Sequence, residues 1–416
     1  MGRIFLQCLD FYRNFAIFNL QFAFYNSGLF GLGGKDGTVR CSGILAIYFC
    51  PFFGNNAGIV NTRSRQMFDT FVRDIKFNCD FSDAQYWGYF SICGLLMRYR
   101  DLFRSEQGLP PWAEFRRSGI TEWIARKEAR WPELEKRDFK DIMIDDAPYH
   151  PFDVFEINRA LTPKGLVYGA GYGMYLKPTF FLARLAAVRE VTDHTVYVAG
   201  REVVRDLFTA PAMLQGRCIF LRREPLKTLL WEKLSELTSG RASALEHAFL
   251  QFGFRPGQAI DQAVEQKLDA MAAIYCDVLL YHELAESMED VPEWNDIVSL
   301  AGDRNAEHYV RAIKDLIADT SDFGPFRVIV EEKDRTALSL FIGLTEGHRK
   351  LLFPEIGAAY REFLSTGNWE SLERTRKAGF ARFQTKRETV LHLYNAGRDK
   401  GAFTEQLRKT MQGNGG

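Results

Sequence analysis

Residues 257–289, GQAIDQAVEQKLDAMAAIYCDVLLYHELAESME, decide the architecture that we expect for the second half of the chain. Apolar residues return every three or four positions along this stretch, which predicts an amphipathic helix. The predicted apolar face consists of Ile260, Val264, Leu268, Met271, Tyr275, Val278 and Ala285. At about 100° per residue, His282 falls at the centre of this face and Glu286 lies about 40° from it.

The chain from residue 225 onward has the same helical character, with glycine or proline between successive segments. The expected helices cover residues 226–238, 241–253, 257–289, 303–319, 333–352, 355–365 and 369–396. Because the connections between them are short, neighbouring helices should pack antiparallel. These features predict an all-helical bundle in this part of the chain.

The first half of the chain has a weaker pattern. Residues 67–138 look helical, and the sequence SDAQ at 82–85 resembles a capping box in front of an aromatic-rich helix. Short β-like runs follow at 165–168, 195–198 and 218–221, together with a predicted helix at 178–191 that has proline in its first turn. We therefore expect a mainly α protein, in which a small mixed α/β unit is followed by a C-terminal helical bundle.

Residues 1–66 differ in composition from the rest of the chain. They contain ten phenylalanines but only two acidic residues, and the first glutamate of the chain is Glu106. We expect Met67 to be the native start, with residues 1–66 as translated upstream sequence or a disordered leader; a poor secretory or membrane signal is the alternative. The expected domains are then 67–224, which is helical with a small α/β unit, and 225–416, which is all-helical.

Composition narrows the class of protein. The formal net charge is zero, which gives no indication of a nucleic acid or an anionic membrane as partner. Charged residues interrupt the apolar runs before they reach the roughly 20 residues of a membrane span. The seven cysteines form no CxxC pair and suit a reducing compartment. We expect a soluble cytoplasmic protein whose partner, where it has one, is another protein.

Two histidines and one glutamate are candidate metal ligands. His282 and Glu286 lie on the apolar face of the first helix, and His348 falls inside the apolar arc of the expected helix 333–352. Two histidines and a carboxylate can hold a non-haem iron or a zinc ion with an open position, so a divalent metal is a candidate cofactor while the cofactor itself stays unknown. Residues 282–286, HELAE, also resemble the zincin pattern, with Glu286 in place of the second histidine. The leading interpretation of these residues is a hydrogen-bonded polar pair in the core, and the metal site is the alternative.

A glycine-rich segment is a second candidate site. Gly169, Gly171 and Gly173 follow an apolar run and precede the helix expected from residue 178. Backbone N–H groups in such a loop can bind a phosphate or nucleotide, and Lys177 would contact its charge. The spacing does not match GxGxxG, and a glycine-rich turn or bulge is the alternative.

Several strings of the chain occur together in a known family. They are SDAQYWG at 82–88, SICGL at 91–95, GLVYGAGYG at 165–173, CDVLLYHE at 276–283 and VRAIKDLIADT at 310–320. With these strings the chain resembles a bacterial family of conserved proteins of unknown function over about residues 67–400. The resemblance implies no activity, cofactor or substrate, and it favours Met67 as the start.

No complete catalytic constellation is visible in the sequence. We therefore expect a binding or regulatory protein without catalytic activity as the leading function. The first alternative is a metal-dependent helical-bundle enzyme that uses His282, Glu286 and His348, with Glu283 as a supporting residue or a general base. The second is a phosphate or nucleotide site at Gly169–Gly173.

Overall fold

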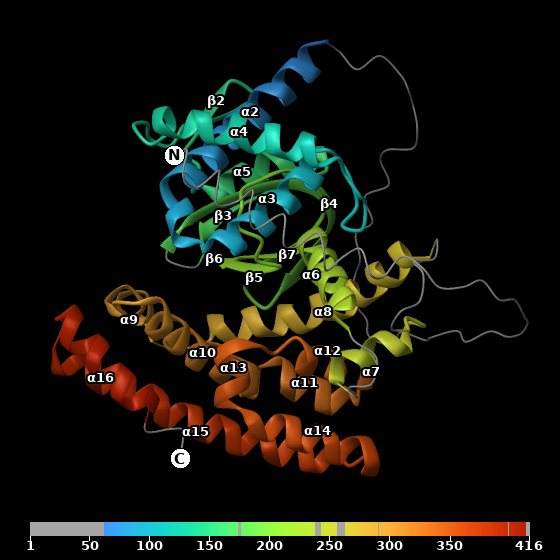
Figure 1. Cartoon of the computed structure of the whole chain (residues 1–416), viewed down its shortest axis with the longest axis vertical. Coiled ribbons are helices and arrows are strands. Elements are labelled where there is room, and N and C mark those ends of the chain that lie inside the picture. Colours follow the sequence, from blue (N-terminus) through green and yellow to red (C-terminus); the bar gives the residue numbers. More distant parts are fainter. Residues whose placement is uncertain are drawn as a thin grey trace, which may run out of the picture.

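The computed structural model describes residues 62–173, 176–237, 243–255, 263–289, 291–397 and 399–412. The expectation about a leader and a start at Met67 concerns residues outside this part of the chain, apart from 62–66 at the beginning of the first described helix. Within the described residues, no helix combines the length and the apolar character that crossing a membrane requires. Figure 1 shows a sheet-containing N-terminal part stacked on a helical C-terminal part.

Among the described residues, the N-terminal part contains six helices of α or 3-10 type and two sheets before the chain enters the C-terminal helices. Its helices are α2 (Thr62–Tyr86), η1 (Trp87–Tyr89), α3 (Ile92–Glu106), α4 (Arg117–Leu134), α5 (Val154–Leu161) and η2 (Thr162–Lys164). Its strands are β1 (Ile142–Ile144), β2 (Ala147–Tyr149), β3 (Leu166–Tyr172), β4 (Pro178–Val191), β5 (His194–Arg205), β6 (Ala212–Gln215) and β7 (Cys218–Arg222).

The larger sheet has the strand order β3-β4-β5-β7-β6, in which only the β5–β7 pair is parallel. A separate two-stranded antiparallel sheet, β1-β2, precedes the larger sheet in the sequence. The pairing of β4 with β5 shifts register near Ala183 and Leu185, which marks bulges that increase the local twist. The expectation of a mainly α fold with only a small mixed unit is therefore wrong, because a mixed five-stranded sheet organises the N-terminal part.

Strand β4 accounts for much of that error. Its sequence, PTFFLARLAAVREV, contains good helix formers and begins with a proline, so it reads as a helix on propensity alone. The first six residues of the strand are all buried, which removes the alternation that would identify a strand. Hydrogen bonds to β3 on one side and β5 on the other then override the helical propensity. The predicted strand runs at 165–168, 195–198 and 218–221 are confirmed within β3, β5 and β7.

The SDAQ sequence at 82–85 does not start a helix, because α2 continues through it. Ser82 is buried and donates its hydroxyl hydrogen bond to the Pro178 carbonyl at the start of β4. The serine that caps a helix here is Ser91, whose Oγ accepts from Gly94 N at 3.1 Å. A buried serine can thus mimic a capping box in sequence while it ties a helix to a strand.

The C-terminal part is helical, as expected. Its helices are α6 (Arg223–Glu236), α7 (Ala244–Gln251), α8 (Val264–Ser287), α9 (Trp294–Leu300), α10 (Arg304–Thr320), α11 (Pro325–Glu332), α12 (Arg335–Gly343), α13 (Gly347–Leu352), α14 (Pro354–Thr366), α15 (Trp369–Ala396) and α16 (Lys400–Gln412). The sequence did not predict α9, α11 and α16, which are short or strongly polar. The expected single helix 333–352 is also wrong, because the chain breaks between α12 and α13.

The sheet has a separate core on each of its faces. On β7, Cys218 and Phe220 belong to a core with α2 and α5, while Ile219 and Leu221 belong to a core with the C-terminal helices. This follows from the two-residue period of a strand, which sends successive side chains to opposite faces. Helix α8 contacts β6 and β7 as well as α10 and α12, so it lies between the sheet and the other C-terminal helices. The position of α8 places the candidate site described next inside the C-terminal helices.

Candidate metal centre

Helix α8 carries the first two side chains of the site. His282 and Glu286 are one helical turn apart and therefore share a face of the helix. Their side chains are each 14% exposed, and His282 Nε2 lies 3.5 Å from Glu286 Oε1. Both residues were predicted as metal ligands from their place on the helical wheel, and the structure brings them together.

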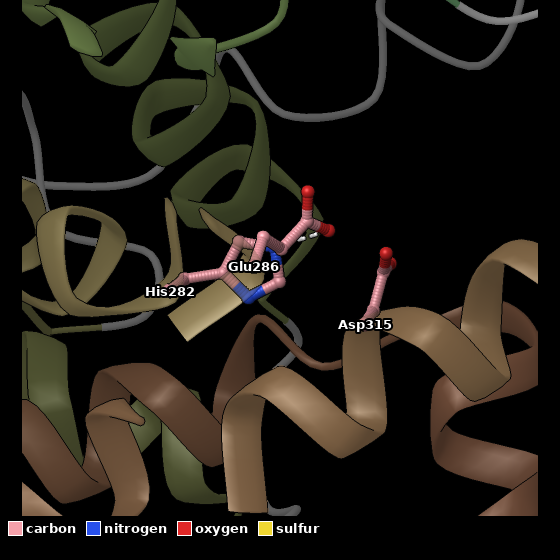
Figure 2. Close-up of side chains that lie close together, drawn as sticks. All are labelled: His282, Glu286 and Asp315. Carbon is pink, nitrogen blue, oxygen red and sulfur yellow. Dashed lines mark ion pairs between the residues drawn. The ribbon is translucent and has the colours of Figure 1, made fainter. Parts of the chain in front are cut away.

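Helix α10 packs against α8 and supplies two carboxylates to the same space. Asp319 Oδ1 accepts a hydrogen bond from His282 Nδ1 at 2.8 Å. Because an ionised carboxylate can only accept, this contact places a proton on Nδ1 and directs Nε2 toward Glu286. Asp315, one turn before Asp319, is the third member of a group in which one ligand atom each of His282, Glu286 and Asp315 lies within 4.8 Å of the others. Figure 2 shows Asp315 extending from its helix toward the space beside Glu286.

Two cations flank this group. Lys314 Nζ donates to Glu286 Oε2 at 2.8 Å, which leaves Oε1 as the oxygen that faces His282. Arg349 Nη1 donates to Asp319 Oδ2 at 3.2 Å, and its Nε lies 4.0 Å from Asp315 Oδ2. Arg349 thus fixes the carboxylate that in turn fixes the imidazole. A carboxylate that holds the second ring nitrogen of a ligating histidine is a common companion of protein metal sites.

The site has more negative than positive charge. Four carboxylates, those of Glu283, Glu286, Asp315 and Asp319, lie in one electrostatically coupled group with the two cations Lys314 and Arg349. With a neutral imidazole the group therefore carries a formal charge of −2, and with a protonated imidazole −1. An excess of buried negative charge is costly unless a cation compensates for it.

The pKa shifts follow this charge distribution. Burial lowers the pKa of His282, but the Asp319 carboxylate more than offsets burial and raises that pKa well above 6.5. Burial likewise raises the pKa of Glu286, yet the His282 and Lys314 partners hold it well below its usual range. For Glu283, burial and then the charge of Glu286 raise the pKa to about 7. Burial also raises the pKa of Asp315, against the effect of Arg349.

His348, the third ligand predicted from the sequence, is not a member of this group among the described residues. Its Nε2 is 2.8 Å from Asn305 Oδ1, and its ring packs edge-on against Tyr309. The cause is the break before α13, where Gly347 has φ +57° and restarts the helix in a new phase. The next residue, Arg349, is the one whose side chain reaches Asp319 and Asp315.

Asp315 and Asp319 were not predicted. A signal for them exists in the sequence, because they are one turn apart in a helix of strong amphipathic character. Asp319 is only 2% exposed, and its immediate neighbours Ile317, Ala318 and Thr320 are also buried. An aspartate in such a position must have a partner, which would have marked it as a site residue.

The glycine-rich segment is a strand rather than a loop in front of a helix. Gly169 and Gly171 lie within β3, and Gly173 follows its end. A Cβ atom at Gly169 would overlap the Phe181 ring, and one at Gly173 would overlap the Phe208 ring. The element that follows is strand β4, so no helix N-terminus stands behind the glycines. Close packing against aromatic rings therefore accounts for Gly169 and Gly173, while Gly171 lies against the Met213 and Gln215 side chains.

Lys177 lies inside the protein. Its Nζ is 3.0 Å from Asp206 Oδ2, 3.2 Å from Asp83 Oδ1 and 2.9 Å from Ser82 Oγ. Burial lowers the pKa of Lys177, but Asp206 and Asp83 together raise it above 10.5. The ammonium group is thus already bound by two carboxylates, and it joins α2 to the sheet. Lys177 therefore has a structural role, in which its ammonium group pairs with two buried carboxylates.

The chain was also compared with known proteins. No curated protein and no solved structure matches it. Residues 70–222 match the N-terminal domain, and residues 227–414 the C-terminal domain, of a family described as a family of unknown function (DUF6866). The two matches together cover most of the chain and divide it where the sheet gives way to the helices. The chain therefore belongs to this two-domain family of unknown function, DUF6866.

Proposed function

We propose that this protein binds a divalent metal ion between α8 and α10, with His282 Nε2, Glu286 Oε1 and an Asp315 carboxylate oxygen as ligands. The observation that supports it is the convergence of these atoms within 4.8 Å, next to an imidazole whose other nitrogen is held by Asp319. Ligand atoms about 2.0–2.2 Å from one ion lie about 3–3.6 Å apart. The three side chains would have to close by about 1 Å, which a small change of rotamer achieves.

The donor set narrows the choice of metal. One imidazole and two carboxylates suit Mn²⁺, Fe²⁺ or Zn²⁺ better than Ca²⁺ or Mg²⁺, which prefer oxygen ligands alone. The two ligating carboxylates balance the charge of such an ion. Three protein ligands also leave coordination positions open, and an ion held in this way supplies Lewis acidity to a molecule that reaches it. This is the chemistry of the metal-dependent helical enzyme that the sequence suggested, with Asp315 in the place of His348.

A structural ion-pair network is the competing explanation for the same residues. In that case the excess negative charge would be carried without a metal, by protonation of His282 and Glu283. The two explanations differ in one measurable respect. A metal site loses affinity when a ligand is replaced, whereas an ion-pair network has no affinity to lose.

The test is metal titration of chelator-treated protein, with Mn²⁺, Zn²⁺ and, under anaerobic conditions, Fe²⁺. We expect close to one equivalent to bind to the wild type. Asp315→Asn and His282→Gln should weaken binding at least tenfold, by analogy with the loss of other metal-site groups. His348→Ala is the matched control and should bind like the wild type. Circular dichroism spectra of the variants verify that each is folded.

Two results would contradict the proposal. One is the absence of binding of all three ions to the wild type. The other is a wild-type affinity in Asp315→Asn together with a loss in His348→Ala, which would return the third ligand to the residue predicted from the sequence. The leading expectation from the sequence, a binding or regulatory role without catalysis, stays a prediction.

A further inference from the structure

A second site lies where the two domains of the family meet. A cavity of about 290 Å³ is enclosed by the end of α3 and the loop after it, by β5, and by the beginnings of α6 and α8. Its walls thus come from both sides of the division near residue 225. Small-molecule sites often form at such junctions, and the volume is at the lower limit for them, so a ligand would be small.

Among the described residues, the cavity is lined by charges of both signs in equal number, four basic and four acidic side chains. Three of the four basic side chains have an acidic partner that also lines the cavity. Arg104 lies 3.5 Å from Asp101, Arg205 3.3 Å from Glu202, and Lys227 3.6 Å from Glu265. Most of the lining charge is therefore balanced before any ligand binds.

Arg201 is the exception among the basic residues. It is exposed at the cavity, and one guanidinium nitrogen lies against the Cα of Gly108, where even a Cβ atom would come within 2.7 Å of it. In the part of the chain that the structure describes, its guanidinium has no ion pair or hydrogen bond. A guanidinium with unused donors at the wall of a cavity is suited to bind a carboxylate.

The acidic residues on the neighbouring wall have capacity for a donor. The backbone N–H of Glu202 donates to Glu224 Oε2 at 2.7 Å, which places two acidic residues together. Glu202 is 5% exposed, and its Oε1 accepts from Arg222 Nε at 2.7 Å. Its Oε2 lies near Arg205 but accepts no hydrogen bond in the described part of the structure. That oxygen is shielded from solvent, so the half-buried carboxylate of Glu224 is the acceptor that a ligand can reach on this wall.

An apolar wall completes the cavity. Leu109, Pro110, Pro111 and Trp112 follow α3 and line one side of it. The Trp112 ring is held edge-on against Trp231 of α6, with 5.8 Å between ring centres. This wall offers contact to an aliphatic or aromatic group.

We infer that this cavity binds a small zwitterionic molecule of the α-amino acid class. The ligand carboxylate lies at Arg201, its ammonium group donates toward the wall of Glu202 and Glu224, and its side chain packs against the loop that contains Trp112. A ligand with one charge of each sign leaves the balance of the lining charges unchanged. A simple anion would leave the wall of Glu202 and Glu224 without a donor, and a simple amine would leave Arg201 without an acceptor.

The test uses the full chain and the twenty L-amino acids as probes. Thermal unfolding is followed with each amino acid at millimolar concentration, and calorimetry then gives the Kd of those that raise the unfolding temperature. We expect at least one amino acid to bind, and Arg201→Gln to weaken that binding about tenfold, as for the loss of one hydrogen-bonded charge. Arg374→Gln, an exposed arginine of α15, is the control and should bind like the wild type.

Two analogues of the best amino acid test its two charges separately. The N-acetyl derivative lacks the ammonium group, and the amide lacks the carboxylate, so both should bind at least tenfold more weakly than the parent. The inference is overturned if no amino acid binds, or if Arg201→Gln binds as tightly as the wild type. It is also overturned if the N-acetyl derivative keeps the parent's affinity, which would identify a simple anion site.

Discussion

Asp319→Asn isolates the contact that orients His282. Asp319 is almost completely buried, accepts from His282 Nδ1 at 2.8 Å and from Arg349 Nη1 at 3.2 Å. The substitution keeps the shape of the side chain and one acceptor but removes the charge. Loss of a charge-assisted hydrogen bond costs about 1.5–3 kcal/mol, and loss of one partner of a fully buried ion pair about 3–5 kcal/mol. Because the side chains of His282 and Arg349 are 14% and 24% exposed, we expect a loss of about 2–3 kcal/mol, near the lower of these ranges.

The loss should depend on pH with a definite sign. The folded protein raises the pKa of His282 well above 6.5, so the His282–Asp319 pair contributes its full stability below about pH 6.5 and loses it as pH rises through the folded pKa. Asp319→Asn should therefore cost more at pH 6 than at pH 9. The cost does not fall to zero at high pH, since the Arg349 contact is also weakened and arginine keeps its charge.

The assay is urea unfolding of chelator-treated protein, followed by far-ultraviolet circular dichroism at both pH values. Asp269→Asn is the control, since Asp269 lies on α8 and its exposed carboxylate pairs with Lys227 at 3.1 Å. An exposed ion pair of this kind contributes at most about 1 kcal/mol. The reasoning is refuted if Asp319→Asn unfolds like the wild type, or if its effect grows as the pH rises.

Three further predictions concern the N-terminal part. Lys177→Met should lower stability by about 3–5 kcal/mol, because it leaves two buried carboxylates without their cation, and thermal unfolding measures this. Gly169→Ala should destabilise the protein by about 1–3 kcal/mol because the added methyl group overlaps the Phe181 ring, whereas Gly88→Ala, which meets no atom within 4 Å, should change stability by less than about 0.5 kcal/mol. Among the four cysteines that the structure describes, exposed Cys93 should react first with a thiol reagent under native conditions, as peptide mapping would show.

The sequence predicted the structure best where the apolar periodicity of a single helix identifies the element. Helix α15 was predicted with the bounds that the structure has, and α8 was placed with His282 and Glu286 on one face. Strand β4 was misread because its burial on both faces hides the two-residue period. In that strand the decisive interactions are hydrogen bonds to β3 and β5, and no property of residues 178–191 alone encodes them.

The difference between a pattern within one helix and a contact between helices also explains which residues of the candidate metal site were predicted. His282 and Glu286 are one turn apart on α8, so helix geometry alone links them. The third ligand must come from another helix, and its choice requires the phase of that helix. A break of a few residues before α13 is sufficient to turn His348 away and bring Arg349 inward.

In the proposed metal site, Arg349 also limits which side chain can serve as the third ligand. A guanidinium beside the site favours carboxylates as its neighbours, and Asp315 and Asp319 of α10 supply them. A histidine in the place of Asp315 would leave the arginine with one partner fewer and the site with less negative charge for a divalent ion. The break before α13 brings Arg349 to the site, and Asp315 on α10 supplies a carboxylate that pairs with it. We therefore expect that a replacement of Arg349 or of Asp315 would require a compensating change in the other.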